Sequence, residues 1–93
     1  MNKIYCLESL VGSIACSVCG NESARICFLL IHGAGSSFQT WNRSIEILSQ
    51  ISLLIAPDLR SHGLSADSSD MSLSSIVYDI GICTTRICIL FYF

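Results

Sequence analysis

Serine, histidine and aspartate, the residue types of a hydrolytic triad, gather in two short segments of this chain. His32, Ser36 and Ser37 lie in the first segment, and Asp58 and His62 lie in the second. A serine nucleophile needs a base within hydrogen-bonding distance and a carboxylate that orients that base. The sequence has no Gly-x-Ser-x-Gly, the sharp turn that exposes such a serine above a sheet. We therefore expect structural roles for these side chains.

The cysteines do not form a pattern typical of metal or redox chemistry. Six are present, and Cys16 and Cys19 make a single Cys-x-x-Cys pair. Structural zinc sites usually need two such pairs, and a redox pair opens a helix in a βαβ unit. Cys27, Cys83 and Cys88 stand among Ile, Leu and Phe, where a free thiol packs as a small apolar group. We expect reduced cysteines, no metal and no other cofactor.

The composition indicates a piece of a larger fold. The chain has 93 residues, of which 52% are hydrophobic and 13% are charged. A free-standing domain carries about 25% charged residues, so this sequence has the character of a larger protein's interior. The net charge is −2 and the five basic residues are scattered. That distribution predicts no nucleic-acid partner.

Apolar runs and glycine-containing loops alternate along the chain and predict an α/β fold. Residues 26–31 and 53–56 are continuous apolar runs, as in strands covered on both faces of a parallel sheet. Residues 41–50 predict a helix between them. Its apolar face comprises Trp41, Ile45, Leu48 and Ile51. Strand, helix and strand in this order require a right-handed crossover between parallel strands, and functional groups then lie beyond the carboxyl ends of the strands.

Two further elements flank this unit. Residues 11–19 are small and apolar enough for a strand, and Gly20-Asn21 predicts a turn after it. The serine-rich residues 65–75 indicate a loop, after which a second helix is expected with Ser72 as its cap. The apolar face of that helix comprises Leu73, Ile76, Val77 and Ile80.

A secretory signal at the N-terminus is an open but unfavoured alternative, and the C-terminal segment does not favour a membrane span. Glu8 interrupts the apolar stretch that a secretory signal would need after Lys3. Asp79 and Arg86 interrupt residues 76–93, which are also shorter than the about 20 residues of a spanning helix. We expect a cytoplasmic protein without a membrane partner.

The two glycine-containing loops, with the strands before them, resemble the N-terminal part of the α/β-hydrolase superfamily. Residues 28–35 are similar to the third strand of that fold and its His-Gly-x-Gly turn. Residues 58–65 resemble the Asp-x-Arg-Gly-x-Gly-x-Ser loop after the fourth strand, with Ser61 in place of the usual glycine. The closest resemblance is to the protein phosphatase methylesterases. It rests on residues 32–37, Thr40-Trp41, Asp58–Gly63 and Asp70–Asp79, and covers roughly residues 25–80.

The resemblance implies a serine carboxylic-ester hydrolase. Ester hydrolysis passes through an oxyanion, which this fold stabilises with backbone N–H groups, one of them from the loop after the third strand. By that match Ala34 is the expected donor and Gly35 the second candidate. The other motif residues are expected to support the loops: His32, Gly33, Asp58, Arg60, His62 and Gly63. The implied partner is the protein phosphatase 2A catalytic subunit, whose C-terminal methyl ester these enzymes remove.

The resemblance divides the chain into three parts. Residues 1–24 form a strand and turn region, residues 25–80 the hydrolase-like part, and residues 81–93 an apolar tail outside the resemblance. The tail is β-prone and would suit a fifth strand, but it has no nucleophile elbow. Because the nucleophile, acid and catalytic histidine are absent, we expect the chain to be inactive alone, as a truncated product or an incomplete gene model.

Three alternatives to a methylesterase fragment remain open. The first is another α/β-hydrolase, such as a small-molecule esterase or an epoxide hydrolase. The second is a non-catalytic truncated chain, whose unpaired strand edges would favour aggregation. The third is a peptide that associates with membranes through residues 87–93.

Overall fold

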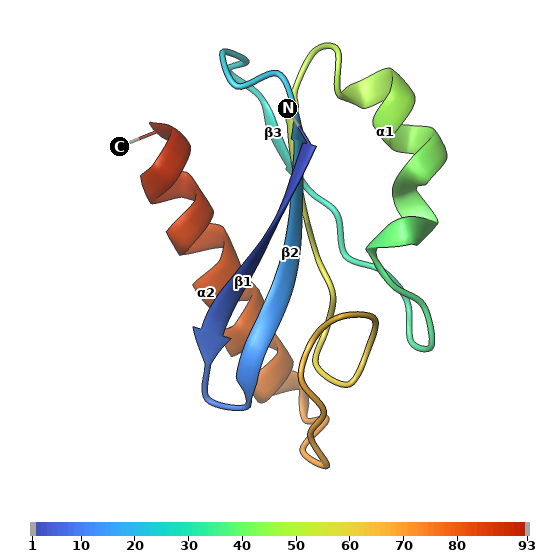
Figure 1. Ribbon diagram of the computed structural model, residues 1–93, viewed down its shortest axis with the longest axis vertical. Coiled ribbons are helices and arrows are strands. Elements are labelled where there is room, and N and C mark those ends of the chain that lie inside the picture. The colour runs from blue at the N-terminus through green and yellow to red at the C-terminus, as the bar shows by residue number, and fades with distance from the viewer. Residues whose placement is uncertain (1, 93) are drawn as a thin grey trace.

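A four-stranded sheet with α-helices on opposite sides makes up the computed structural model, which describes residues 2–92 (Figure 1). The short helix η1 is a 3₁₀ helix that leads directly into α1. In chain order the elements are β1 Asn2–Ser9, β2 Gly12–Gly20, β3 Cys27–Leu29, η1 Phe38–Trp41, α1 Asn42–Leu48, β4 Leu53–Pro57 and α2 Leu73–Tyr92.

The strands lie in the order β1-β2-β4-β3. The pair β3 and β4 is parallel and is connected through α1, as predicted for a crossover. The hairpin of β1 and β2 is antiparallel, and β2 also pairs antiparallel with β4. The predicted α/β class is confirmed, and the sheet within it is mixed. The strand β1 was not predicted, although the alternation of half-buried Tyr5 and Leu7 with exposed Cys6 and Glu8 is typical of a half-covered strand.

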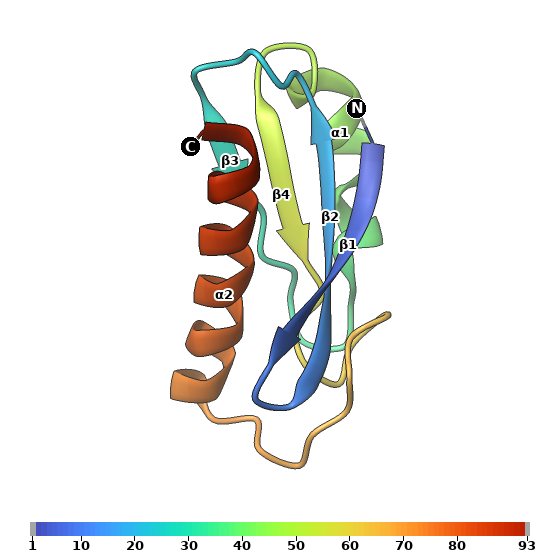
Figure 2. The ribbon, with the colours of Figure 1, turned by 60° about the vertical axis from the view of Figure 1, so that its left-hand side comes forward.

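The apolar core lies between α2 and the two central strands, β2 and β4. The side chains that form it are Ile14, Cys16, Val18, Leu53, Ile55, Cys83 and Ile87. Figure 2 shows α1 and α2 on opposite sides of these strands. Because both faces of β4 are covered, its continuous apolar run is buried throughout, as predicted.

The strand β3 differs from its prediction in length and burial. The sequence predicts a covered strand over residues 26–31, but β3 has three residues, and Phe28 and Leu29 are 39% and 40% exposed. The physical reason is position, because β3 lies at the edge of the sheet next to β4. An apolar run indicates burial only where another element covers it, and within residues 2–92 nothing covers this one fully.

The first α-helix is shorter than predicted and begins one residue later. Trp41 belongs to η1, and Ile51 follows α1 and is 60% exposed. Trp41, Ile45 and Leu48 are half-buried, so the predicted apolar face exists without Ile51. Ser37 caps η1, since its Oγ accepts the Gln39 N–H at 3.3 Å.

The second helix continues through most of the tail. Residues 87–92 are helical, although their β-prone composition would also suit a strand. Asp79, Cys83 and Ile87 are spaced by four residues and are all buried on one face of α2. That spacing matches the helical repeat, and packing on the sheet outweighs the β-propensity of the tail. The predicted cap is confirmed, because Ser72 Oγ accepts the Ser75 N–H at 3.4 Å.

By length and composition alone, α2 could cross a membrane, because residues Leu73–Phe91 are long and apolar enough. The expectation that this segment is too short is therefore wrong, because the helix begins at Leu73 and has 20 residues. In the structure Cys83 and Ile87 pack into the core of the sheet.

The extended backbone of β2 separates the two thiols of the Cys-x-x-Cys pair. Cys16 and Cys19 are three residues apart in a strand, so their Cα atoms lie about 10 Å apart and their side chains point to opposite faces of the sheet. All six cysteines are free thiols. A hydrogen bond with Cys83 and burial raise the pKa of the Cys16 thiol above its ordinary value. These observations fit packing roles for the core cysteines.

Candidate functional site

The two loops singled out in the sequence meet where β3 and β4 end. Residues 32–37 follow β3, residues 58–65 follow β4, and the two strands are parallel neighbours. Three backbone amides connect the loops across this edge. The donors and acceptors are Leu59 N–H to His32 Nε2 at 3.0 Å, Gly35 N–H to His62 Nε2 at 2.9 Å, and Phe38 N–H to Asp58 Oδ1 at 2.6 Å. The structure therefore brings together His32, Gly35, Asp58 and His62.

Asp58 organises both loops from a fully buried position. Its carboxylate accepts the Phe38 N–H through Oδ1 and the Leu64 N–H through Oδ2, at 2.6 and 2.9 Å. Gly63 makes this possible because its φ is +49° and a Cβ there would lie 2.1 Å from Asp58 Oδ2. Both carboxylate oxygens are thus committed to the backbone, which suits loop support better than proton transfer.

The β1–β2 hairpin anchors the loop of residues 58–65 through hydrogen bonds of Ala15. Asp58 N–H donates to the Ala15 carbonyl at 2.8 Å, and the Ala15 N–H donates to Ser65 Oγ at 2.9 Å. The Ser65 hydroxyl in turn donates to the Asp58 carbonyl at 2.6 Å. The sequence analysis missed Ala15, because no side-chain chemistry marks a residue that contributes only its backbone.

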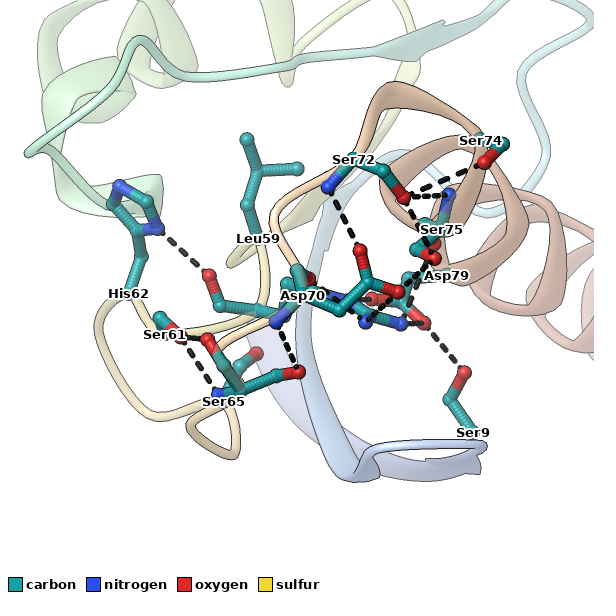
Figure 3. Close-up of polar contacts among 12 residues, drawn as sticks. Ser9, Leu59, Ser61, His62, Ser65, Asp70, Ser72, Ser74, Ser75 and Asp79 are labelled. Carbon is teal, nitrogen blue, oxygen red and sulfur yellow. Dashed lines mark hydrogen bonds and ion pairs between the residues drawn. The ribbon is translucent and has the colours of Figure 1, made fainter.

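Arg60 forms a buried ion pair with Asp79 of α2. Figure 3 shows that the hydroxyl of Ser9 also reaches the Asp79 carboxylate. Arg60 Nε and Nη2 donate to Asp79 Oδ2 and Oδ1 at 2.7 and 3.0 Å, and the two residues are 4% and 1% exposed. Ser9 donates a further hydrogen bond to Asp79 Oδ1 at 2.5 Å. The hydrogen bond with Asp79 raises the pKa of Arg60 above its ordinary value. Asp79 was not a predicted site residue, because its partners Arg60 and Ser9 are distant from it in sequence.

Ser61, which stands where the resemblance would place a glycine, has a left-handed backbone. Its φ is +64°, uncommon for a non-glycine residue. The side chain compensates locally, because Ser61 Oγ donates to the Ser68 carbonyl at 2.9 Å and accepts the Ser68 N–H at 2.8 Å. These two bonds hold Ser61 in its left-handed conformation.

Asp70 accepts hydrogen bonds from residues at the start of α2, and these bonds lower the pKa of its carboxyl group. Hydrogen bonds from Ser75 and Ser72 to its carboxylate, with a smaller effect of Arg60, lower the pKa of Asp70 from 3.8 to about 2. The Ser75 hydroxyl and the Ser72 N–H donate to Asp70 at 2.6 and 3.0 Å. These bonds strengthen when the carboxylate is ionised, so ionised Asp70 stabilises the folded chain.

We predict that Asp70→Asn lowers stability at neutral pH and has no such effect in strong acid. The contribution of the carboxylate is complete above pH 3.8 and is lost as the pH falls toward about 2. Urea unfolding followed by circular dichroism between pH 2 and 7 measures the difference between variant and wild type. Asp67→Asn, an exposed change of equal charge in the same loop, is the control. A difference that persists undiminished at pH 2 would contradict the prediction.

The two histidines form adjacent bridges between the loops. Their ring centroids are 5.0 Å apart and the rings are inclined by 50°. His32 Nδ1 lies 2.8 Å from the Gly33 carbonyl, and His62 Nδ1 lies 2.9 Å from the Arg60 carbonyl. Each Nε2 accepts an amide N–H, so each Nδ1 carries the proton. A catalytic histidine would direct Nδ1–H to a carboxylate and Nε2 to a serine, and neither ring does so.

The first loop turns at Gly33–Ser36 and presents one free amide. Ser36 N–H donates to the Gly33 carbonyl at 3.1 Å, and Gly35 has φ +80°, as the third residue of a type II turn requires. Gly35 N–H is bonded to His62. Ala34 is exposed, and its N–H forms no hydrogen bond with any part of residues 2–92. Of the two predicted oxyanion donors, Ala34 is thus the one whose amide is available.

Sheet order, crossover and loops together define the N-terminal portion of the α/β-hydrolase fold. In solved structures, 23 chains match this one. A thioesterase domain from the curacin biosynthetic pathway has a TM-score of 0.81 at 22% identity and covers 92% of this chain. A haloalkane dehalogenase from Bradyrhizobium elkanii has a TM-score of 0.82 at 18% identity and covers 94%. The N-acyl homoserine lactonase AidH has a TM-score of 0.81 at 27% identity and covers 94%.

The chain spans about a third of the length of these structures: 33%, 29% and 33% respectively. No protein-family model matches the sequence, and no curated protein matches it. The comparisons thus show the α/β-hydrolase fold and the share of it that this chain contains.

Proposed function

We propose that this chain is the N-terminal part of a serine carboxylic-ester hydrolase, in which the residue 32–37 loop supplies one oxyanion donor. The observation that carries the proposal is the unbonded amide of Ala34, in a turn held by the neighbouring loop at the carboxyl end of parallel strands. Donors of this kind are most effective when they are fixed before the reaction starts. The anchoring of this turn supports that role.

In the proposed reaction, a serine outside these 93 residues attacks the ester carbonyl carbon. The carbonyl oxygen gains negative charge, and Ala34 N–H donates a hydrogen bond to it. The alcohol leaves, and water then hydrolyses the acyl-enzyme. Within this chain His32, His62 and Asp58 hold the turn, and Arg60 fixes the loop after β4 to α2. The chain alone is proposed to be inactive, because it contains no nucleophile elbow.

The proposed substrate is a protein methyl ester, the C-terminal ester of the protein phosphatase 2A catalytic subunit, and the proposed location is the cytoplasm. The support is the resemblance of residues 32–37 and 58–63 to the methylesterases. A second candidate is a small-molecule hydrolase of the same fold, an esterase or an epoxide hydrolase. The matches to a thioesterase domain and a lactonase favour ester-type chemistry in that case.

Two measurements test the proposal. The purified 93-residue chain should show no turnover of a p-nitrophenyl ester above buffer; turnover that a serine-directed inhibitor abolishes would contradict the inactive state. Sequencing of transcripts beyond codon 80 should reveal a Gly-x-Ser-x-Gly. The product that contains it should release methanol from a methylated C-terminal peptide of the phosphatase subunit. Cleavage of small esters or epoxides alone would favour the second candidate, and no hydrolase sequence downstream would contradict both.

A further inference from the structure

His62 joins the tip of the Gly33–Ser36 turn to the loop after β4. Its Nε2 accepts the Gly35 N–H at 2.9 Å, and its Nδ1 faces the Arg60 carbonyl at 2.9 Å, the bond drawn in Figure 3. An amide N–H can only donate, so Nε2 must be unprotonated. The observed geometry therefore requires the neutral imidazole with its proton on Nδ1.

We propose that His62 is a positioning residue that fixes the Ala34 amide only while its imidazole is neutral. The inference rests on the proposed function for what the Ala34 amide binds, but the loop contact itself is independent of any substrate. Protonation places a hydrogen on Nε2, where it faces the Gly35 N–H instead of accepting from it. The turn then loses its contact with the loop after β4.

The turn depends on His62 because little else restrains its tip. Anchors exist at its two ends, where His32 accepts the Leu59 N–H and Asp58 accepts the Phe38 N–H. Between these ends, nothing lies within 4 Å of a Cβ placed on Gly33 or Gly35. Within residues 2–92, one hydrogen bond joins the tip of this turn to another part of the structure, and it runs from the Gly35 N–H to His62. Loss of that bond frees the tip while leaving the anchored ends in place.

The charged groups near His62 are engaged with other partners. On the first loop the facing titratable group is His32, whose ring lies 5.0 Å away, and a second proton there would repel the first. On the second loop the Asp58 carboxylate is committed to two backbone amides. The Arg60 guanidinium forms ion pairs with the carboxylates of Asp70 and of Asp79 in α2. Asp67 is exposed. Among residues 2–92 no carboxylate pairs with His62.

The decisive test is nuclear magnetic resonance on the ¹⁵N-labelled 93-residue chain. At pH 8 the long-range ¹H–¹⁵N spectrum should show the Nδ1–H tautomer for His62. The Gly35 amide should exchange with solvent more slowly than its intrinsic rate by about fivefold, the effect of one hydrogen bond. At pH 5 this protection should vanish, and ¹⁵N relaxation should show increased motion at Ala34. An Nε2–H tautomer at pH 8 would overturn the proposal without any variant.

Two substitutions separate positioning from a general effect on folding. His62→Gln keeps an acceptor that does not titrate, so Gly35 protection should become independent of pH. His62→Phe keeps a ring without an acceptor, so protection should be absent at both pH values. Equal protection in wild type and the Phe variant would overturn the proposal. These measurements contain no substrate, so a negative result for His62 would not contradict the proposed ester hydrolysis. Conversely, absence of ester hydrolysis in the longer product would not contradict the role of His62 in positioning the turn.

Discussion

Replacement of Ala34 by proline is expected to lower kcat about 100- to 1,000-fold in the product that carries the nucleophile, the usual effect of losing one oxyanion donor. Ala34 is the second residue of the Gly33–Ser36 turn. Proline is favoured at that position of a type II turn, so the substitution removes the N–H while keeping the backbone path. The loss should therefore appear in kcat rather than in stability.

Steady-state kinetics on an ester substrate measures this effect. Ala34→Ser keeps the N–H and is the matched control, with activity expected near wild type. Gly33→Pro is unsuitable as a control because it would restrict His32 before the turn. Full activity of Ala34→Pro would assign the oxyanion donor elsewhere and contradict the proposed role of the loop.

Gly63→Ala is expected to destabilise the chain by about 3 kcal/mol. A left-handed alanine costs about 1 kcal/mol, and the new Cβ would lie 2.1 Å from Asp58 Oδ2. That carboxylate cannot turn away without releasing the Phe38 or Leu64 amide, and an unsatisfied buried amide adds about 1–3 kcal/mol.

A second glycine in the same site provides the control. Gly35 also has positive φ, at +80°, but nothing lies within 4 Å of its hypothetical Cβ. Gly35→Ala should therefore show the conformational cost alone, about 1 kcal/mol. Urea unfolding of both variants gives the comparison, and equal losses would show that the Asp58 carboxylate is not rigidly held.

Much of the fold near the two loops could be predicted because local patterns determine it. The apolar run of β4, the cap at Ser72 and the crossover through α1 each depend on neighbours in sequence. The meeting of the two loops followed from the parallel pairing of their strands. Ala34 and Gly35 were chosen from a motif, and only the geometry distinguished the free amide from the bonded one.

The remaining features depend on partners that are distant in sequence. Asp79 meets Arg60 and Ser9 only after α2 has docked on the sheet, so no local pattern identifies that contact. The exposure of β3 depends on what covers the edge of the sheet. The helical tail is different, because Cys83 and Ile87 follow Asp79 at helical spacing, a pattern that is local in the sequence.

The attachment of the loops to the hairpin also constrains the order of folding. Ala15 and Ser65 are separated by 50 residues and Ser9 and Asp79 by 70 residues. Contacts of such long sequence separation slow folding, because the chain loses entropy before they form. On the ribosome, where N-terminal segments emerge first, the β1–β2 hairpin can pair long before β4 and α2 are available. The turn that contains Ala34 should therefore reach its final geometry among the last parts of the chain.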